Sequence, residues 1–185
     1  MPNWCSNSIT IKGPVAKIET LWKTLDTDNA DRVNGLLEAL VPIGTWEYGT
    51  AVDTWGTKWD VNTDDLDYSS YEDGTASISG CFDSAWAPPT AAFQTYSELN
   101  PDVYAELWYE EPGMCFVGHW NSDDGDDSYE YTDADATTIS EVVPAYLVDA
   151  FDLVSRFEDE DYEDDDENYI DSTVAVNALF NPVTE

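Results

Sequence analysis

Polar and apolar residues alternate in several short stretches of the chain, which is the pattern of strands with one buried face. In Ser8–Lys12, for example, isoleucine takes every second position. Short turns such as Glu111-Pro112-Gly113 separate the later stretches and favour antiparallel hairpins. The pattern predicts strands at Ser8–Lys12, Thr57–Val61, Leu66–Ser70, Ala76–Phe82, Val103–Tyr109, Cys115–Trp120 and Ser128–Thr132.

Other segments repeat apolar residues every three or four positions, which is the spacing of one helix face. A helix is predicted after Gly13-Pro14 as far as Leu25, and another at Thr90–Leu99 after Pro88-Pro89. A third is predicted at Thr138–Arg156, where Pro144 either kinks the helix or marks its true start. A shorter helix is expected at Asn34–Leu40.

This order of elements predicts an α+β fold, a largely antiparallel sheet with helices packed on one face. We assign residues 1–156 to that domain. Residues 157–185 form an acidic C-terminal tail, because nine of the ten residues from Glu158 to Glu167 are acidic and repel one another. We expect this tail to be solvated and mobile.

Charge is the most informative property of the composition. Forty Asp and Glu face six Lys and Arg in 185 residues, a net charge of −34 at pH 7. Duplex DNA carries about one charge per 1.7 Å, so this charge equals that of roughly 58 Å of duplex. A folded chain of this length has a radius of gyration of about 16 Å. Its charge density therefore rivals that of DNA.

The same charge restricts the class of partner. It repels nucleic acid and anionic lipid and attracts basic protein surfaces. We therefore expect a basic partner protein, no direct binding of nucleic acid and no membrane association. The sequence has no signal peptide and no apolar run of about eighteen residues, so we expect a cytoplasmic protein. Cys5, Cys81 and Cys115 form no C-x-x-C pair and are expected to be reduced residues of the core.

Nucleophilic catalysis finds little support in the sequence. His119 is the single histidine, and a lone histidine usually packs or lies at the surface. Cysteine–histidine chemistry needs the two groups in contact. Cys115 lies four residues away on the same predicted strand, about 13 Å distant. No catalytic residue is therefore assigned, and the protein is predicted not to be an enzyme.

Carboxylate catalysis is a weak alternative. The best pair for a hydrolase is Asp83, near Trp86, with Glu110 or Glu111. We favour a structural role instead, in which Asp83 or the following serine caps the turn before the helix and Trp86 packs on the sheet.

No metal or cofactor site is predicted. Asp60, Asn62 and Asp64 have the spacing that begins an EF-hand loop, but Asp65 stands where that loop needs glycine, and Tyr71 stands where it needs a bidentate glutamate.

Lys58 is the exception to the acidity, because it lies between Trp55 and Trp59. We expect it to pair with a neighbouring carboxylate such as Asp60; the alternative is that it anchors an acidic ligand.

Four stretches, in this order, resemble one family: Met1-Pro2-Asn3-Trp4-Cys5-Ser6-Asn7, Trp55-Gly56-Thr57-Lys58-Trp59-Asp60, Phe82-Asp83-Ser84-Ala85-Trp86-Ala87-Pro88-Pro89 and Tyr109-Glu110-Glu111-Pro112-Gly113-Met114. Over roughly residues 1–132 the chain resembles the YubB-type ferredoxin-like proteins of plasmids and bacteriophages. The resemblance implies a ferredoxin-like βαββαβ core and an origin on a mobile element. It implies no activity, and the acidity departs from what it would suggest.

The function that these observations favour is that of a non-enzymatic phage or mobile-element protein. It would mimic the charge of DNA and inhibit a nucleic-acid-binding protein of the host, such as a defence nuclease, a nucleoid protein or a polymerase. The alternative is a binding protein whose acidity is an adaptation to salt. The predicted partner-binding acidic surface consists of Asp123, Asp124, Asp126, Asp127, Glu158, Asp159, Glu160, Asp161, Glu163, Asp164, Asp165, Asp166 and Glu167.

Overall fold

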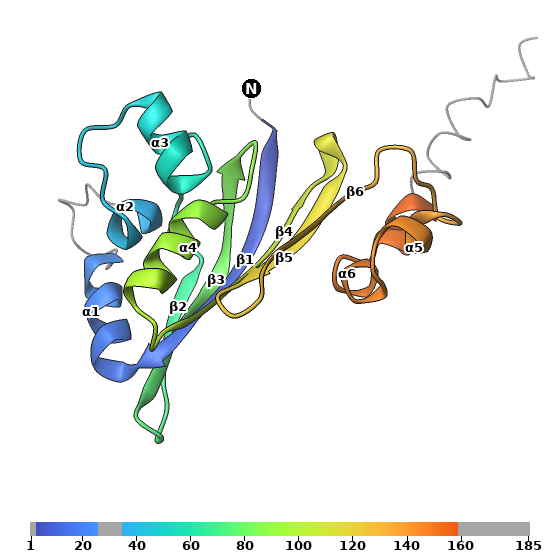
Figure 1. Cartoon of the computed structure of the whole chain (residues 1–185). Helices are drawn as coiled ribbons and strands as arrows, with labels where there is room; N and C mark the ends of the chain where they lie inside the picture. The colour runs from blue at the N-terminus through green and yellow to red at the C-terminus, as the bar shows by residue number, and fades with distance from the viewer. Residues whose placement is uncertain (1–2, 26–34, 159–185) are drawn as a thin grey trace, which may run out of the picture. The chain divides into compact units, whose positions relative to one another are not determined.

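The computed structural model describes residues 3–25 and 35–158, which divide between two compact units, 1–132 and 133–185. Figure 1 shows the elements of the first unit, a sheet with helices against it. In chain order they are β1 Trp4–Pro14, α1 Val15–Leu25, α2 Leu36–Leu40, α3 Tyr48–Trp55, β2 Leu66–Ser70, β3 Thr75–Ala85, α4 Thr90–Leu99, β4 Tyr104–Glu111, the 3-10 turn η1 Pro112–Met114, β5 Phe116–Asn121 and β6 Gly125–Glu130.

The six strands form one sheet in the order β2-β3-β1-β4-β5-β6, and every neighbouring pair is antiparallel. The helical connection through α1 leads from β1 to β2, and α4 leads from β3 to β4. In each case another strand lies between the two that are connected. This is the split βαβ arrangement of a ferredoxin-like fold, so the predicted fold class is confirmed. Strands β5 and β6 extend the sheet beyond β4.

The hydrophobic core lies between the sheet and α1 and α4, which contact it on one face (Figure 1). The alternation of β1 explains the choice of face: Cys5, Ile9 and Ile11 are buried, while the residues between them are more exposed. Asn7 continues the buried series although it is polar. Its side-chain amide donates to the carbonyl oxygens of Cys5 and Phe82, at 2.7 and 3.3 Å. The buried amide hydrogens therefore have hydrogen-bond acceptors in the core.

Gly80 allows β2 to lie close against β3. It is paired with Leu66, and its backbone has a φ of 153°. A Cβ atom at this position would overlap the carbonyl oxygen of Asp65 and crowd the Cα of Leu66. The contact is between two backbones, so no side-chain rotation can relieve it.

One predicted strand is wrong. Thr57–Val61 is not a strand, and α3 precedes it where no helix was expected. Ala51 and Trp55 lie four residues apart and are both buried, which is helical spacing. Gly56 then ends the helix in the left-handed conformation, at a φ of 87°. The aromatic, glycine-interrupted sequence hid this short helix.

The second unit begins at residue 133, and its predicted long helix is interrupted. Two short helices, α5 Ile139–Val142 and α6 Ala145–Ala150, replace its first part, and residues 153–158 are again helical. Pro144 separates α5 from α6, because a residue before proline is driven to an extended conformation, as Val143 is here. The domain boundary expected at residue 156 stays a prediction.

The three cysteines are free, but only Cys5 belongs to the core. Cys81 is exposed and Cys115 is half-buried. Cys81 is not a core residue as expected, because it precedes the buried Phe82 on β3 and so points to the face opposite the helices. Trp86, expected to pack on the sheet, is 45% exposed and has a positive φ of 74°. In the described residues no helix has the length and hydropathy needed to cross a membrane.

Candidate functional site

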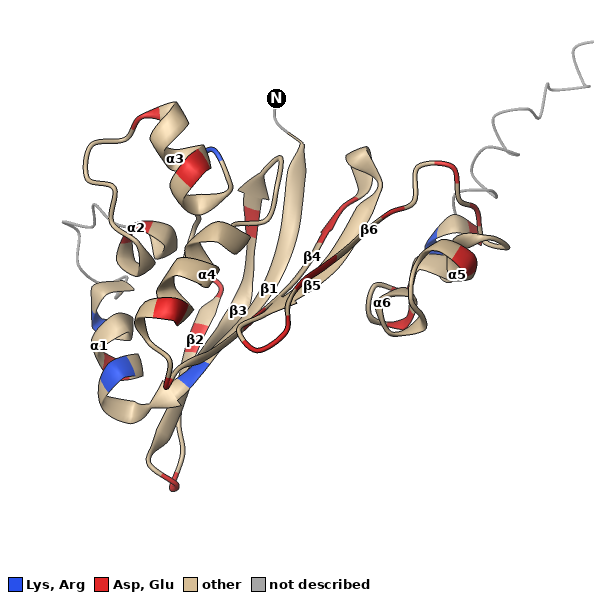
Figure 2. Ribbon diagram, viewed as in Figure 1, with Lys and Arg blue, Asp and Glu red and all other residues tan. Residues whose placement is uncertain are grey.

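Acidic residues gather at the two edges of the sheet. Residues 3–25 and 35–132 contain 21 carboxylates and four lysines, a net charge of −17. Ten of these carboxylates are in two groups of five, one along β6 and one around β2, which are the two edge strands. Figure 2 shows acidic positions on both edges and on the connecting elements. The carboxylates of this unit are therefore concentrated, not evenly scattered.

The β6 group, which we call the β6 acidic edge, contains the first four residues of the predicted surface. It consists of Asp123, Asp124, Asp126, Asp127 and Glu130, all of which are exposed. The turn into β6 is held by a neighbouring side chain: the Oδ1 of Asn121 accepts from the backbone N–H groups of Asp123 and Asp124, at 3.0 and 2.8 Å. These bonds fix the backbone of the turn from which the two carboxylates extend.

Asp126 is anchored from the core side of the sheet. The hydroxyl of Tyr109, a residue that is 1% exposed, donates to the Asp126 carboxylate at 2.6 Å. Gly118 lies on the strand between them, and a Cβ there would overlap the tyrosine ring. Because Gly118 has no side chain, the Tyr109 ring can lie over it and reach the β6 acidic edge.

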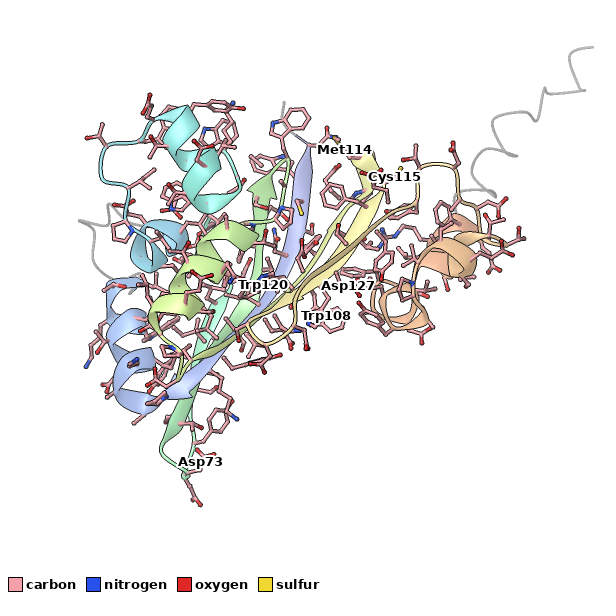
Figure 3. The ribbon with its side chains drawn as sticks, viewed as in Figure 1. Asp73, Trp108, Met114, Cys115, Trp120 and Asp127 are labelled. Atoms are coloured by element: carbon pink, nitrogen blue, oxygen red, sulfur yellow. The ribbon has the colours of Figure 1, made fainter. Side chains whose placement is uncertain are left out.

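The β2 group, which we call the β2 acidic edge, comprises Asp64, Asp65, Asp67, Glu72 and Asp73, and these residues are also exposed. It is less uniform than the β6 acidic edge. Asp73 lies at the far tip of the β2–β3 hairpin (Figure 3), where the hydroxyl and backbone N–H of Thr75 lower the pKa of its carboxyl. Lys12 also contributes to that lowering, so a cation lies near this end of the β2 acidic edge.

The dimensions of the two edges can be compared with those of DNA. Successive residues of a strand rise about 3.3 Å and point to opposite faces, so side chains on one face repeat at about 6.6 Å, twice the 3.4 Å axial rise of phosphates along one DNA strand. Five inter-strand steps separate β2 from β6, roughly 24 Å in all. This exceeds the about 12 Å width of the major groove. A basic element that fits a single groove would therefore meet one acidic edge at a time.

The rest of the predicted surface lies in the second unit. Glu158 is exposed and ends the helical residues 153–158. The remaining eight residues of that prediction, Asp159, Glu160, Asp161, Glu163, Asp164, Asp165, Asp166 and Glu167, lie outside the described residues.

A second cluster occupies the sheet face opposite α1 and α4. Glu106 accepts hydrogen bonds from the Tyr104 hydroxyl at 2.8 Å and from the Trp108 indole at 2.9 Å. His119 stacks on Trp108 with ring centroids 4.0 Å apart, and its Nε2 is 3.7 Å from Glu106. Burial raises the pKa of Glu106, but the bonds from Trp108 and Tyr104 outweigh it and lower the pKa overall. The sequence did not reveal this cluster, because it depends on the register between β4 and β5.

The catalytic candidates lie in different surroundings. Cys115 lies outside β5, in a left-handed conformation, and its thiol donates to the Pro112 carbonyl oxygen. Of the acidic pair, Asp83 and Glu110 flank Ser6 across β1. Asp83 is exposed and accepts from the Ser6 hydroxyl at 3.0 Å. Glu111 is instead buried on the other face, where it accepts from the Gly113 N–H.

Asp60 has a structural role that differs from both roles considered for it. Its carboxylate accepts from the backbone N–H groups of Leu37 and Glu38, at 2.7 and 3.1 Å, at the start of α2. Lys58 does not pair with Asp60 as expected; its ammonium instead lies 4.3 Å from the centre of the Trp59 ring. Within residues 3–25 and 35–158 there is no group of three or more residues suited to a metal ion.

We expect the protein to lose stability steeply at alkaline pH because of two tyrosines. The pKa of Tyr109 is raised, first by burial and then by the hydrogen bond to Asp126. The pKa of Tyr104 is raised from its ordinary 10.0 to about 12, first by burial and then by the hydrogen bond to Glu106. A raised pKa in the folded state gives a contribution that is complete below pH 10 and lost as the pH rises through the folded value. Urea midpoints measured from pH 7 to 12 should be flat to about pH 9 and then fall.

The control for this pH dependence is Tyr104→Phe, which removes one of the two groups and should make the alkaline decline shallower. Absorbance near 295 nm gives an independent readout of tyrosine ionisation. If every tyrosine ionised near pH 10 while the fold persisted, the explanation would be wrong.

Comparisons with known proteins identify the relatives of this fold. Residues 54–149, just over half of the chain, match the family model described as the ferredoxin-like domain in Api92-like protein. Among solved structures, the protein Api92 from Yersinia pseudotuberculosis is similar at 18% identity and a TM-score of 0.36. That alignment covers 53% of this chain and 40% of the other. A comparison with curated proteins found no match.

Proposed function

Since the chain belongs to the family of ferredoxin-like domains in Api92-like proteins, its fold is a shared scaffold, and we propose that its function lies in the charge carried on it. The protein is a non-enzymatic mimic of DNA charge. It binds a basic, nucleic-acid-binding protein of the host cell and occupies the surface that would hold DNA. The proposal includes three further statements: that the chain is related to the YubB-type proteins, that it originates on a mobile element, and that it acts in the host cytoplasm.

The β6 acidic edge is the observation that carries the proposal. Five exposed carboxylates follow one another within eight residues, on a regular strand and its turn. The four lysines of the first unit are engaged at other places. Lys17 and Lys23 pair with Asp102 and Glu19, while Lys12 and Lys58 lie over aromatic rings. The edge therefore offers a partner an array of negative charge on one strand and the turn before it.

The geometry also indicates how such an array would act. Side chains alternate between the two faces of a strand, so Asp126 and Asp127 present their carboxylates on opposite faces of β6, beside those of Asp123 and Asp124 in the preceding turn. A partner surface rich in Lys and Arg would meet opposite charges on both faces of this edge. Long-range attraction by the whole chain, at −34, would raise the rate of encounter.

The proposal is tested by competition. The full chain is immobilised, nuclease-treated bacterial lysate is passed over it, and retained proteins are identified and purified. Each is then bound to labelled duplex DNA, and the chain is titrated in while DNA release is measured. We expect the retained proteins to be DNA-binding and the chain to displace DNA from them. Affinity should fall by about 10³-fold or more between 50 and 200 mM salt, as for proteins that contact several phosphates.

Two results would contradict the proposal. One is binding to a DNA-binding factor that is unchanged from low to high salt. The other is retention of proteins from which the chain displaces no DNA. A neutral protein of similar size on the same support gives the background.

A further inference from the structure

Aromatic side chains gather without burial at the end of the sheet where β1 begins and β3 ends. Trp4, Trp46, Tyr48, Trp59 and Trp86 are each between 37% and 57% exposed, and we call them the aromatic cluster. With about half of each residue exposed, they present roughly 500 Å² of surface, much of it aromatic. That area is within the range of the largest apolar patches of ordinary monomers, which are often functional.

Side-chain contacts and backbone pairing bring these residues to the same end of the sheet. The rings of Trp4 and Trp59 lie 6.4 Å apart. The Trp46 indole donates to the Lys58 carbonyl oxygen at 3.0 Å, which ties the loop before α3 to the loop after it. Trp86 follows Ala85, the residue that pairs with Trp4 on the neighbouring strand. The backbone N–H of Trp86 donates to the Asn3 carbonyl oxygen.

The cluster already holds one cation. The Lys58 ammonium lies 4.3 Å from the centre of the Trp59 ring and 5.9 Å from that of Tyr48. Both distances are within the range of cation–π attraction. Glu47, between Trp46 and Tyr48 in the chain, is an exposed carboxylate at the N-cap of α3, and Asp53 is another on the same helix. The local chemistry is thus that of aromatic faces that attract cations beside negative charge.

We propose that the aromatic cluster docks an arginine-bearing segment of the basic partner, so this inference rests on the proposed function. Charge complementarity selects the occupant. Guanidinium groups are planar and stack on aromatic faces better than ammonium groups do, and tryptophan, tyrosine and arginine dominate the energetic centres of protein interfaces. Single-stranded nucleic acid also stacks on aromatics, but it requires a positive groove. The first unit instead has a net charge of −17 over its described residues.

The test compares two labelled peptides, one of alternating arginine and glycine and its counterpart with lysine at every arginine. Dissociation constants for the full chain are measured by fluorescence anisotropy at about 0.15 M ionic strength. We expect the arginine peptide to bind about two- to fivefold more tightly, the equivalent of one exposed cation–π contact. Trp59→Leu and Trp86→Leu keep apolar surface but remove the indole ring, and each should reduce the preference for arginine.

Leu99→Ala is the matched control. Leu99 is 71% exposed and ends α4 near the start of β4, which pairs with the far end of β1 from Trp4. It should leave both constants unchanged. Unchanged thermal unfolding of each variant shows that the fold persists.

Other outcomes separate this inference from the proposed function. Equal affinity for the two peptides, or tryptophan variants that keep the arginine preference, would overturn the docking site. If both peptides still bound in a salt-sensitive way, the charge mimicry would stand. Binding of labelled oligothymidylate in preference to either peptide overturns both.

Discussion

Gly80→Ala should destabilise the first unit by about 3 kcal/mol, the largest effect of any single substitution considered for this protein. The new Cβ would overlap the Asp65 carbonyl oxygen, and alanine would have to adopt a φ near 153°. Relief requires β2 to move away from β3, which would expose Leu66 and Ile78. With a urea m-value near 2 kcal/mol/M, the unfolding midpoint should fall by about 1.5 M.

Gly49→Ala is the matched control for this substitution. Gly49 lies in the first turn of α3, and a Cβ there would meet no atom within 4 Å. Alanine is a better helix former than glycine by about 1 kcal/mol, so this variant should be neutral or slightly more stable. Tryptophan fluorescence follows unfolding in both. A Gly80→Ala protein with an unchanged midpoint would show that β2 does not pack as closely as described.

Neutralising the β6 acidic edge should have the largest effect on binding. Asp123, Asp124, Asp126 and Asp127 are each replaced by asparagine, which keeps the side-chain shape and the acceptor for Tyr109. Each lost exposed ion pair is worth about 0.5 kcal/mol, so four amount to about 2 kcal/mol, roughly thirtyfold in the dissociation constant. The measurement is the concentration at which the variant displaces DNA from a captured partner.

The matched control carries the same change of net charge on the other edge. Asp64, Asp65, Asp67 and Asp73 become asparagine, and displacement should weaken less than threefold. If the two variants lost equal affinity, only total charge would matter, and no particular edge would be the interface. If neither lost affinity, charge mimicry itself would be refuted.

Periodicity predicted the regular elements well and failed where a local signal was overridden. The helix at Val15–Leu25 and that at Thr90–Leu99 have the predicted bounds because their apolar spacing and their preceding prolines agree. β1 extends back to Trp4, beyond its prediction, because Asn7 satisfies its amide by hydrogen bonds in the core. A polar residue in an apolar series looks like the end of a strand when its partners are unknown.

The two candidate surfaces were predictable only in part. The runs of Asp around Gly125 could be recognised as acidic from the sequence, but their position on an edge strand could not. That position depends on strand order, which no local pattern contains. The aromatic cluster is a similar case: Trp4 and Trp59 are distant in sequence although their rings are neighbours, and Trp86 lies at the same end of the sheet because β1 pairs with β3. The Glu106–His119 approach likewise follows from strand register.

The placement of acids on both outer strands also affects how copies of the protein meet. An open sheet exposes unpaired backbone groups at each edge, and these groups can recruit another strand and start aggregation. Here each edge carries five carboxylates, so two approaching molecules repel one another before their backbones can pair. The same residues that would attract a basic partner therefore also keep the sheet from growing by self-association.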